Sequence, residues 1–524
     1  MAAVFHVSAT GSDGNSGSAA SPFRQIRRAL MSAVPGDTIL VGDGGYLGFD
    51  VAGKIGGAAS VLTIRALGQG ANVLPTSDRS DNRDTIHVSG SAWVVVEGLR
   101  AFNGNRASVR VNASHHVTIR NGVFGDNATW AIFTNHSDDL LLEGNVCFGS
   151  VAEHGIYVSN SGDRPVVRGN RNYGNRGAGI QLNADASQGG DGLITGAVIE
   201  NNILSGNGAG GGGAINLDGV QDSIVRNNLL YDNHASGITN FQIDGAAGPR
   251  GMRILNNTID QAADGRWALL ISDTTGVNVV RNNILYNRHS FRGGLLFGDA
   301  ADAAATDSDY NVMDWISTDN GGSRISLAQW KALGHDANSL SATLASLFVS
   351  SAAADYHLSP GSPARDRGVS LTDVPQDLEG RARPAGTAFD IGCYELFAPA
   401  GTSFFTVTPC RIADTRNPAG PWGGPALAAN TERDFTAAGR CGIPPTAAAL
   451  SINVTVTQPS AAGNLRLFPG GTAAPLASAA NYRAGQTRAN NAVVGLSAGG
   501  SLTVRCDQSA GMVHVILDVN GYFE

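Results

Sequence analysis

An internal repeat between His87 and Asn311 constrains the fold more than any other feature. Short apolar runs such as VIENNILS, IVRNNLLY and VVRNNILY recur, each with an Asn at the same place. The Asn positions 145, 170, 202, 228, 257, 283 and 311 are 25, 32, 26, 29, 26 and 28 residues apart by subtraction, and Leu99 and Gly122 hold the two earlier equivalent positions. Repeats of about this length are typical of a solenoid, in which no single coil can bury its own apolar face.

The residues within the repeat predict an all-β chain built on a right-handed parallel β-helix. Ile, Val and Asn carry the period, whereas a leucine-rich-repeat solenoid needs regularly spaced Leu. One apolar position per coil should fill the interior: Val109, Ile132, Ile156, Ile180, Ile215, Ile238 and Leu269. We expect the recurrent Asn side chains to stack at a turn and to hydrogen-bond from coil to coil.

A second column alternates in charge. Equivalent positions of six successive coils hold Glu97, Arg120, Glu143, Arg168, Glu200 and Arg226. Neighbours one coil apart should form ion pairs on a second sheet, away from the working face. We therefore predict a structural role for these arginines.

Composition and length frame the domain organisation. The 524 residues include 69 Gly and only 6% aromatics, which suits tight coils, and the net charge of -8 argues against a dedicated nucleic-acid binder. No run of 18 apolar residues predicts a transmembrane segment, and the opening residues lack an apolar signal core, so we expect any export signal to have been removed. The expected parts are an N-terminal cap with first coils (1–85), the β-helix core (86–313), a closing segment (314–395), a linker (396–403) and a β-sandwich (404–524).

Each end of the stack should be covered. We expect a helix from about Pro22 to Val34 over the first coil, and another within residues 323–340 over the far end. Among the five cysteines, Cys410 and Cys441 are the expected disulfide, although Cys506 could compete with either. Cys147 and Cys393 should be buried as small apolar residues.

Three parts of the β-helix region carry a resemblance. The opening VFHVSATGSDGNSGS, the Asn-containing coils and the closing DLEGRARPAGTAFDIGCYE resemble secreted bacterial right-handed β-helix proteins of the pectate-lyase-like superfamily. That resemblance implies a secreted protein that acts on or binds polysaccharide, since the superfamily includes lyases, uronan epimerases, glycoside hydrolases and binding spikes. The C-terminal elements PCRIADTR, CGIP and LDVNGYF resemble a module of exported bacterial proteins, in which Trp422 is the obvious stacking residue.

An outward-facing column predicts a groove for a linear polymer. One residue per coil, next to the interior position, gives a polar and aromatic stripe spaced by about 4.8 Å. Its members are His87, Arg110, Phe133, Tyr157, Gln181, Asn216, Thr239 and Leu270. The alternative is an ordinary solvated sheet face.

Two insertions point to the centre of this groove. Most coils have 12 or 13 residues between the outward residue and the recurrent Asn, but Gln181 to Asn202 spans 21 and Thr239 to Asn257 spans 18 by subtraction. The extra residues, NADASQGGDGLITG and QIDGAAGPRG, leave the same edge of the strand. Loops that grow on one side of a solenoid usually mark its working face. They should bring Asp185, Asp191 and Asp244 near Asn183 and Asp218.

The residues at this centre suit proton transfer on a uronate. Abstraction of the C5 proton needs a base, an acid for the leaving oxygen and cationic help for the carboxylate. The resemblance implies these roles for Tyr157, His154 and Arg110, although His154 could equally be a turn residue bonded to backbone. The expected substrate-binding residues are Phe133, His136, Gln181, Asn183, Asn216, His234 and Asp244.

Other chemistries stay open. Asp185 and Asp218, with Asp244, could act as a carboxylate pair in glycoside hydrolysis, although the sequence lacks the NTD, GDD and GHG signatures of polygalacturonase-like hydrolases. Calcium is a further expectation, because Asp185, Asp191 and Asp218 supply hard oxygen ligands. A non-catalytic glycan binder or surface spike is the third alternative.

Overall fold

The computed structural model describes residues 2–75, 83–397 and 402–524. The chain forms two units, residues 1–397 and 398–524, and each is described by itself. Residues 398–401, half of the predicted linker, lie outside the described residues, as do residues 76–82 of the predicted N-terminal region.

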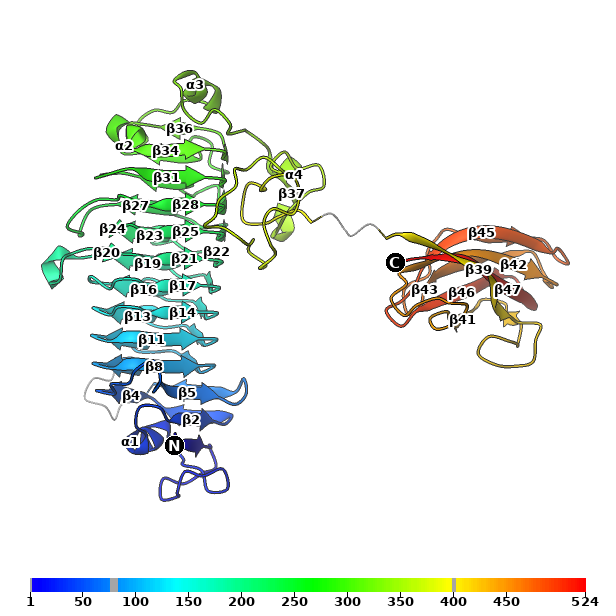
Figure 1. The fold of residues 1–524 in the computed structure, drawn as a ribbon, viewed down its shortest axis with the longest axis horizontal. Helices are drawn as coiled ribbons and strands as arrows, with labels where there is room; N and C mark the ends of the chain where they lie inside the picture. Colours follow the sequence, from blue (N-terminus) through cyan, green and yellow to red (C-terminus); the bar gives the residue numbers. More distant parts are fainter. Residues whose placement is uncertain (1, 76–82, 398–401) are drawn as a thin grey trace. The chain divides into compact units, whose positions relative to one another are not determined.

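The first unit is a right-handed parallel β-helix, as the sequence predicts (Figure 1). Each coil gives one strand to each of three sheets. The first sheet contains β1 (Val4–Val7), β2 (Thr38–Val41), β5 (Leu62–Ala66), β8 (Ala92–Glu97), β11 (His115–Arg120), β14 (Leu141–Glu143), β17 (Val166–Arg168), β21 (Val198–Glu200), β25 (Ile224–Arg226), β28 (Arg253–Leu255), β31 (Asn278–Arg281) and β34 (Thr306–Asp309).

The second sheet is called the groove sheet below, because it carries the outward column. It contains β4 (Phe49–Ala52), β7 (Asp84–Ser89), β10 (Ala107–Asn112), β13 (Trp130–Asn135), β16 (Ile156–Ser159), β19 (Ile180–Asn183), β23 (Gly213–Asp218), β27 (Ser236–Phe241), β30 (Leu269–Ile271), β33 (Leu295–Phe297) and β36 (Ile316–Ser317).

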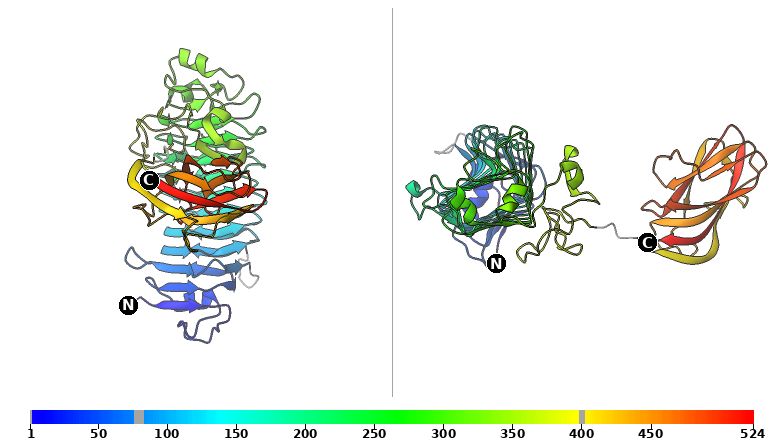
Figure 2. Two further views of the ribbon diagram at one scale, coloured as in Figure 1. Left: turned by 90° about the vertical axis from the view of Figure 1, so that its right-hand side faces the viewer. Right: turned by 90° about the horizontal axis from the view of Figure 1, so that it is seen from above.

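The third sheet completes each coil. It contains β3 (Gly44–Leu47), β6 (Ala71–Leu74), β9 (Arg100–Phe102), β12 (Val123–Gly125), β15 (Val146–Phe148), β18 (Arg171–Tyr173), β22 (Ile203–Ser205), β26 (Leu229–Tyr231), β29 (Thr258–Gln261), β32 (Ile284–Asn287) and β35 (Val312–Met313). Viewed from above, the coils of this unit superpose around one interior (Figure 2). The predicted interior column from Val109 to Leu269 is fully buried and in register from strand to strand, so this prediction is confirmed.

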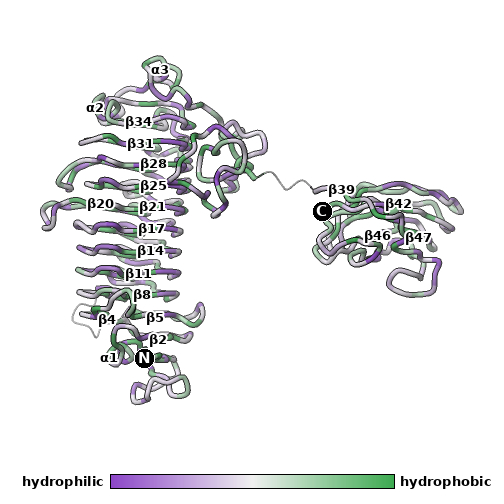
Figure 3. Tube along the Cα trace, viewed as in Figure 1, coloured by the Kyte–Doolittle hydropathy of each residue, from purple (hydrophilic) through white to green (hydrophobic). Residues whose placement is uncertain are grey.

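The predicted Asn ladder is present at the corner between the first and third sheets. The side-chain oxygen of Asn202 accepts hydrogen bonds from the backbone and side-chain nitrogens of Asn170 at 2.9 and 3.0 Å. Its amide group donates to the carbonyl of Val167 at 2.8 Å and to Asn228 at 3.0 Å. The same pattern continues to Asn311, and hydrophilic segments accordingly recur at this side of successive coils (Figure 3).

The residue before each ladder Asn explains the recurrent NN and GN pairs. Asn201 and Asn227 have φ of 56° and 52°, and Gly169 has φ of 63°. Asn and Gly tolerate this left-handed conformation better than other residues, so the first residue of each pair turns the chain and the second enters the ladder.

A second, shorter ladder was not predicted. Asn175, Asn207 and Asn233 stack at the turn between the third sheet and the groove sheet, with side-chain bonds of 2.9 and 3.1 Å. This ladder stiffens the turns that lead into the groove sheet.

The alternating charges lie in one register on the first sheet, as predicted. Arg120 pairs with Glu97 at 3.0 Å, and Arg168 pairs with Glu143 at 2.7 Å. Arg226 pairs with Glu200 at 2.6 Å. This sheet is a different face from the groove sheet, which supports the structural assignment.

Helices cover both ends of the stack. Helix α1 (Ile26–Ser32) buries Ile26 and Leu30 against the first coils, inside the range predicted from the sequence. At the far end, α2 (Ala300–Ala304) precedes the last coil and α3 (Leu327–Ala332) places Leu327 and Trp330 in the same apolar core.

The segment that follows folds back along the side of the solenoid. It contains α4 (Leu344–Leu347), β37 (Phe348–Ser350) and β38 (Asp355–Leu358), and then irregular chain to Phe397. The amides of Asn227, Asn256 and Asn282 donate to its backbone carbonyls, at 2.6 Å for the bond from Asn227 to Gln376. Only the part around α3 closes the end, so the predicted closing segment 314–395 has two different roles.

The second unit is an antiparallel all-β domain made of two sheets. One contains β39 (Phe404–Asp414), β47 (Met512–Phe523), β42 (Ala449–Thr457), β45 (Arg488–Gly495) and β40 (Leu427–Ala428). The other contains β41 (Thr431–Thr436), β46 (Ser501–Gln508), β43 (Gly463–Pro469) and β44 (Ala480–Tyr482). Buried side chains of both sheets form one core.

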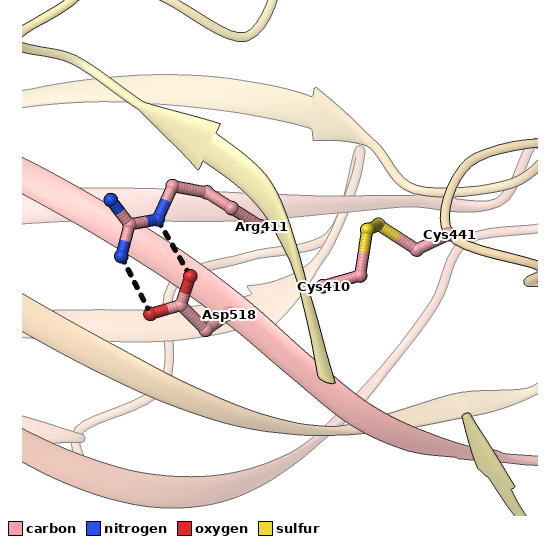
Figure 4. Close-up of a disulfide and its surroundings, with 4 residues drawn as sticks. All are labelled: Cys410, Arg411, Cys441 and Asp518. Atoms are coloured by element: carbon pink, nitrogen blue, oxygen red, sulfur yellow. Dashed lines mark hydrogen bonds and ion pairs between the residues drawn. A yellow bond between two sulfur atoms is a disulfide. The ribbon is translucent and has the colours of Figure 1, made fainter. Parts of the chain in front are cut away.

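The predicted disulfide between Cys410 and Cys441 is present in this unit (Figure 4). Next to it, Arg411 donates to Asp518 at 2.8 Å. Cys147, Cys393 and Cys506 are free and buried. Trp422 is covered on one face by the guanidinium of Arg440, 4.1 Å from the ring centre. None of the helices in the described residues is long and apolar enough to span a membrane.

The charge ladder makes a testable prediction. Arg168→Glu would place three carboxylates in a row with Glu143 and Glu200, and should lower the free energy of unfolding by about 1 kcal/mol, because the pairs are partly exposed. Arg168→Gln is the matched control and should lower it by less. Urea unfolding of both variants measures the difference, and equal stability of the Glu variant and the native chain would contradict the assignment.

Candidate functional site

The outward column lies on the groove sheet in the predicted order. Arg110 is paired with His87 and Phe133, Phe133 with Tyr157, and Tyr157 with Gln181. The column continues through Asn216, Thr239, Leu270 and Leu296. At about 4.8 Å per strand, the seven intervals from His87 to Leu270 extend over roughly 34 Å.

The two insertions lie together at the edge where the groove strands end, called here the downstream edge. The backbone N–H of Ala186 donates to the carbonyl of Asp244 at 3.0 Å, and that of Ala246 donates to Gly192 at 2.9 Å. Asn183 donates to the Asp244 carboxylate at 3.3 Å and accepts from Gln181 at 3.1 Å. The structure therefore brings Asp244 next to Asn183, as expected, and adds Gln181 to the group.

Asp218 holds the second insertion in place. The residue is 1% exposed, and its carboxylate accepts the backbone N–H groups of Ile243, Asp244 and Gly245 at 2.8, 2.9 and 3.2 Å. Burial raises the pKa of this carboxyl, while the three N–H donors oppose the rise. A group so fully engaged with backbone is an anchor for the loop.

Asp185 and Asp191 are also engaged with their own loop. Asp185 accepts the hydroxyl and N–H of Ser187 at 2.6 and 2.8 Å, which lowers its pKa. Asp191 accepts the N–H of Leu193 at 2.9 Å.

The expected calcium site does not fit this arrangement. Asp185, Asp191 and Asp218 each accept hydrogen bonds from a different backbone segment. In residues 2–75, 83–397 and 402–524 no three His, Cys, Asp or Glu side chains form a group suited to a metal ion. The residues present therefore do not match the expected calcium ligands.

Tyr157 belongs to an aromatic platform. Its ring stacks on Phe133 with centroids 5.5 Å apart, and Trp130 stacks on Phe133 at 4.3 Å. Burial raises the pKa of the Tyr157 phenol, and the nearby acids, Glu153 first, raise it further. Tyr157 is thus a neutral phenol near pH 7, and its raised pKa makes it a weaker acid than an exposed tyrosine.

His154 is bonded to backbone, the alternative that the sequence left open. Its Nδ1 accepts the N–H of Ala178 at 2.9 Å, and its ring lies edge-on to Tyr157. Burial lowers the pKa of His154 to about 4. The neutral ring therefore carries its proton on Nε2, which corrects the expectation of a base near neutral pH.

The other predicted residues are spread along the groove. The guanidinium of Arg110 lies over the Phe133 ring at 5.5 Å and within 3.7 Å of Asp84, two strands from Tyr157. His136 follows β13 at the downstream edge. His234 lies at the opposite edge, where the turns enter the groove strands, which we call the upstream edge.

A pocket of about 660 Å³ lies on the same face, further along the stack than the predicted centre. Its lining includes Asn216, Thr239 and Leu270, three residues of the predicted column. The lining also contains residues that the sequence reasoning missed: Arg266, Trp267, His289, Phe291, Arg292 and Asp273. The segments ADGRW and RHSFRG are the sequence signal that could have indicated them, because both are charged turns that directly precede groove strands.

The two edges of the pocket differ in charge. Arg266 and Arg292 lie on the upstream edge, and Arg292 donates to the carbonyl of Gly265 at 2.9 Å. Asp273 is the acidic residue of the lining and follows a groove strand on the downstream edge. The pocket can therefore hold an anionic group against the arginines and leave a neutral ring over Thr239 and Leu270.

Comparison with known proteins confirms the fold. The family described as "Right handed beta helix region" matches residues 67–211 and 150–311. A pectate lyase, Pel9A, has a similar structure with a TM-score of 0.53 and 16% identity, covering 75% of this chain and 96% of that one. No curated protein matches the sequence.

Two further solved structures are similar over a smaller part. An alginate lyase from Paenibacillus sp. has a TM-score of 0.44 and 19% identity, covering 56% of this chain and 97% of that one. The A-module of the Azotobacter vinelandii mannuronan C-5 epimerase AlgE4 has a TM-score of 0.36 and 16% identity, covering 54% and 86%.

The buried imidazole of His154 makes a prediction about pH. Its pKa of about 4 in the folded chain lies below the ordinary value of 6.5, so its contribution to stability is present above pH 6.5 and is lost as pH falls through about 4. His154→Asn keeps an acceptor for the Ala178 N–H and removes the titration. The loss of unfolding free energy between about pH 7 and pH 4 should be smaller in this variant. An NMR titration placing His154 near its ordinary pKa would contradict the burial argument.

Proposed function

We propose that this protein, whose residues 67–311 match the right handed beta helix region, is an exported enzyme. It acts on an anionic polysaccharide, which binds in the pocket of the groove sheet. The reaction is proton abstraction at C5 of a uronate unit, followed by β-elimination or by epimerisation. The charge of the pocket carries this proposal. Two arginines and one carboxylate among its lining residues favour an anionic ligand.

The shape of the groove agrees with a polymer substrate. The column runs along the strand stack, and the partly exposed side chains of Trp130, Phe133 and Tyr157 form an aromatic platform at a distance from the pocket. A linear chain lying along the axis would contact the platform with one stretch and the pocket with another. The shared fold with a pectate lyase is consistent with this use.

Arginine is the appropriate residue for the carboxylate. Its planar guanidinium binds carboxylate through two parallel hydrogen bonds and stays charged throughout. Removal of the C5 proton spreads negative charge onto the same carboxylate, so a cation already in contact with it stabilises the transition state more than the ground state. Arg266 and Arg292 would supply this stabilisation.

A carboxylate-pair hydrolase is less consistent with the observed bonds. That chemistry needs one carboxylate free to attack or to activate water and a second able to deliver a proton. Asp218 is committed to three backbone N–H groups, and Asp185 caps a short helical turn, η1 (Ala186–Gln188).

The disulfide between Cys410 and Cys441 supports export, because such bonds persist in oxidising compartments.

A polysaccharide screen tests the proposal. Polygalacturonate, alginate, hyaluronate and a neutral glucan are each assayed for the ultraviolet absorbance of an unsaturated product, for new reducing ends and for exchange of the C5 proton with deuterated water. Elimination or exchange on a uronate polymer is expected. Reducing ends without absorbance would indicate a hydrolase, and binding without any of the three changes would indicate a glycan-binding protein.

The same screen includes arginine variants. Arg266→Gln and Arg292→Gln should each lower kcat/KM by roughly 10- to 100-fold, the value of a charge-assisted hydrogen bond. Arg367→Gln is the matched control and should leave kcat/KM unchanged. Arg367 is an exposed residue of the segment that folds back along the side of the solenoid. Full activity in both pocket variants would remove the pocket from the proposal.

Tyr157→Phe decides between the pocket and the centre expected from the sequence. Tyr157 lies four strands from β30, about 19 Å along the stack, so it cannot contact the sugar held by Arg266. If the reacting uronate is bound in the pocket, Tyr157→Phe should raise KM a few-fold with little change in kcat. A loss of about a hundredfold or more in kcat would instead place proton transfer at Tyr157, as first expected.

A further inference from the structure

The histidines around the groove differ in which ring nitrogen can accept a proton. His154 accepts the N–H of Ala178 at Nδ1. His289, in the pocket lining, accepts the N–H groups of Phe291 and Arg292 at Nδ1, at 3.0 and 3.1 Å. A neutral ring whose Nδ1 accepts must carry its proton on Nε2. Both rings can therefore donate from Nε2, and neither can accept a proton there.

His234 has the opposite arrangement. Its Nδ1 lies 3.0 and 2.9 Å from the two carboxylate oxygens of Asp264. An ionised carboxylate only accepts hydrogen bonds, so Nδ1 must donate, and the lone pair of the neutral ring is on Nε2. The His234 side chain is 37% exposed, which leaves the ring open to a ligand.

The pair formed by His234 and Asp264 lies beside the pocket. His234 precedes the pocket residue Ser236 by two positions, and Asp264 precedes the pocket residue Arg266 by two. The two turns are joined by a hydrogen bond of 2.7 Å from the N–H of Arg266 to the carbonyl of Ala235. The carboxylate-binding arginine and the carboxylate-oriented histidine thus belong to neighbouring turns of the upstream edge.

We propose that His234, positioned by Asp264, is the residue that accepts the C5 proton of a uronate bound to Arg266 and Arg292. This role rests on the proposed function. The C5–H bond breaks, its proton passes to Nε2, and the imidazolium is stabilised by Asp264. In elimination the electron pair forms the C4–C5 double bond as the C4–O4 bond breaks, and the proton on Nε2 passes to the departing oxygen, which returns the ring to its neutral state.

The sequence predicts His234 only as a substrate-binding residue. It gives no sign of Asp264, because nothing in the chain order relates Asp264 to a residue thirty positions earlier. The pairing arises from the stacking of one coil on the next.

The tautomers are tested first, without any substrate. Nitrogen-15 NMR of the whole protein should show His234 protonated on Nδ1, and His154 and His289 protonated on Nε2, with signals assigned by the loss of each in a His→Asn variant. In Asp264→Asn the side chain can donate to Nδ1, so the proton of His234 should move to Nε2. A His234 already protonated on Nε2 in the native chain would overturn the proposal.

Kinetics on the uronate polymer found by the screen test the role itself. His234→Asn should lower kcat by about a hundredfold or more with KM changed only a few-fold. Asp264→Asn should also lower kcat, because His234 would then carry its proton on Nε2 and could not accept the C5 proton there. Asp232→Asn, an exposed acid in the same turn, is the matched control and should leave both constants unchanged.

The outcomes separate this role from the proposed function. Turnover of a uronate polymer with kcat of His234→Asn within tenfold of the native value would overturn the role of His234 and leave the proposed function standing. Absence of turnover or C5 exchange on every polymer would overturn the proposed function and this role with it.

Discussion

The hydrogen-bonded Asn ladder is the interaction on which the rest of the structure depends. Each ladder side chain is buried and uses both its oxygen and its nitrogen, as at Asn202 and Asn228. Removing one would leave several buried groups unpaired, at a cost of about 1–3 kcal/mol for each group. A slip of one residue would also turn the interior column outward. The ladder and the apolar interior therefore enforce the same register.

That register creates the groove and limits where function can evolve. Strand positions repeat at about 4.8 Å and are held by their neighbours above and below, so their side chains form regular columns. Apart from the short ladder of Asn175, Asn207 and Asn233, the turns and insertions at the two edges are less constrained and can vary in length and charge. Asp218 and Asp185 of the downstream edge anchor loops, whereas the upstream edge contributes two arginines and one histidine to the pocket. The proposed function therefore places the chemistry on one edge of a regular scaffold.

Hydrogen-bond partners, more than residue types, distinguish the histidines of this edge. His154 and His289 cap backbone N–H groups, and burial lowers the pKa of both. His234 faces a carboxylate and presents the other tautomer. Three residues of one type, in comparable turns, therefore have different capacities for proton transfer.

The sequence by itself determined the coils, the interior column, the Asn ladder and the charge ladder. Each of these follows from a period or a local motif, because a parallel stack turns a constant spacing in sequence into contact in space. The outward column followed from the same register, and the two long insertions on one edge predicted that Asp244 lies near Asn183.

Only the tertiary structure decided which of these residues are available for chemistry. The commitment of Asp218 to three N–H groups and the bond from Ala178 to His154 depend on loop paths that no period specifies. The pocket formed by Arg266, Trp267 and Arg292 arises from turns of different lengths stacked on one another. Spacing along the chain fixes which coils are neighbours, but the direction of a side chain in an irregular turn is set by the packing of the turns above and below it.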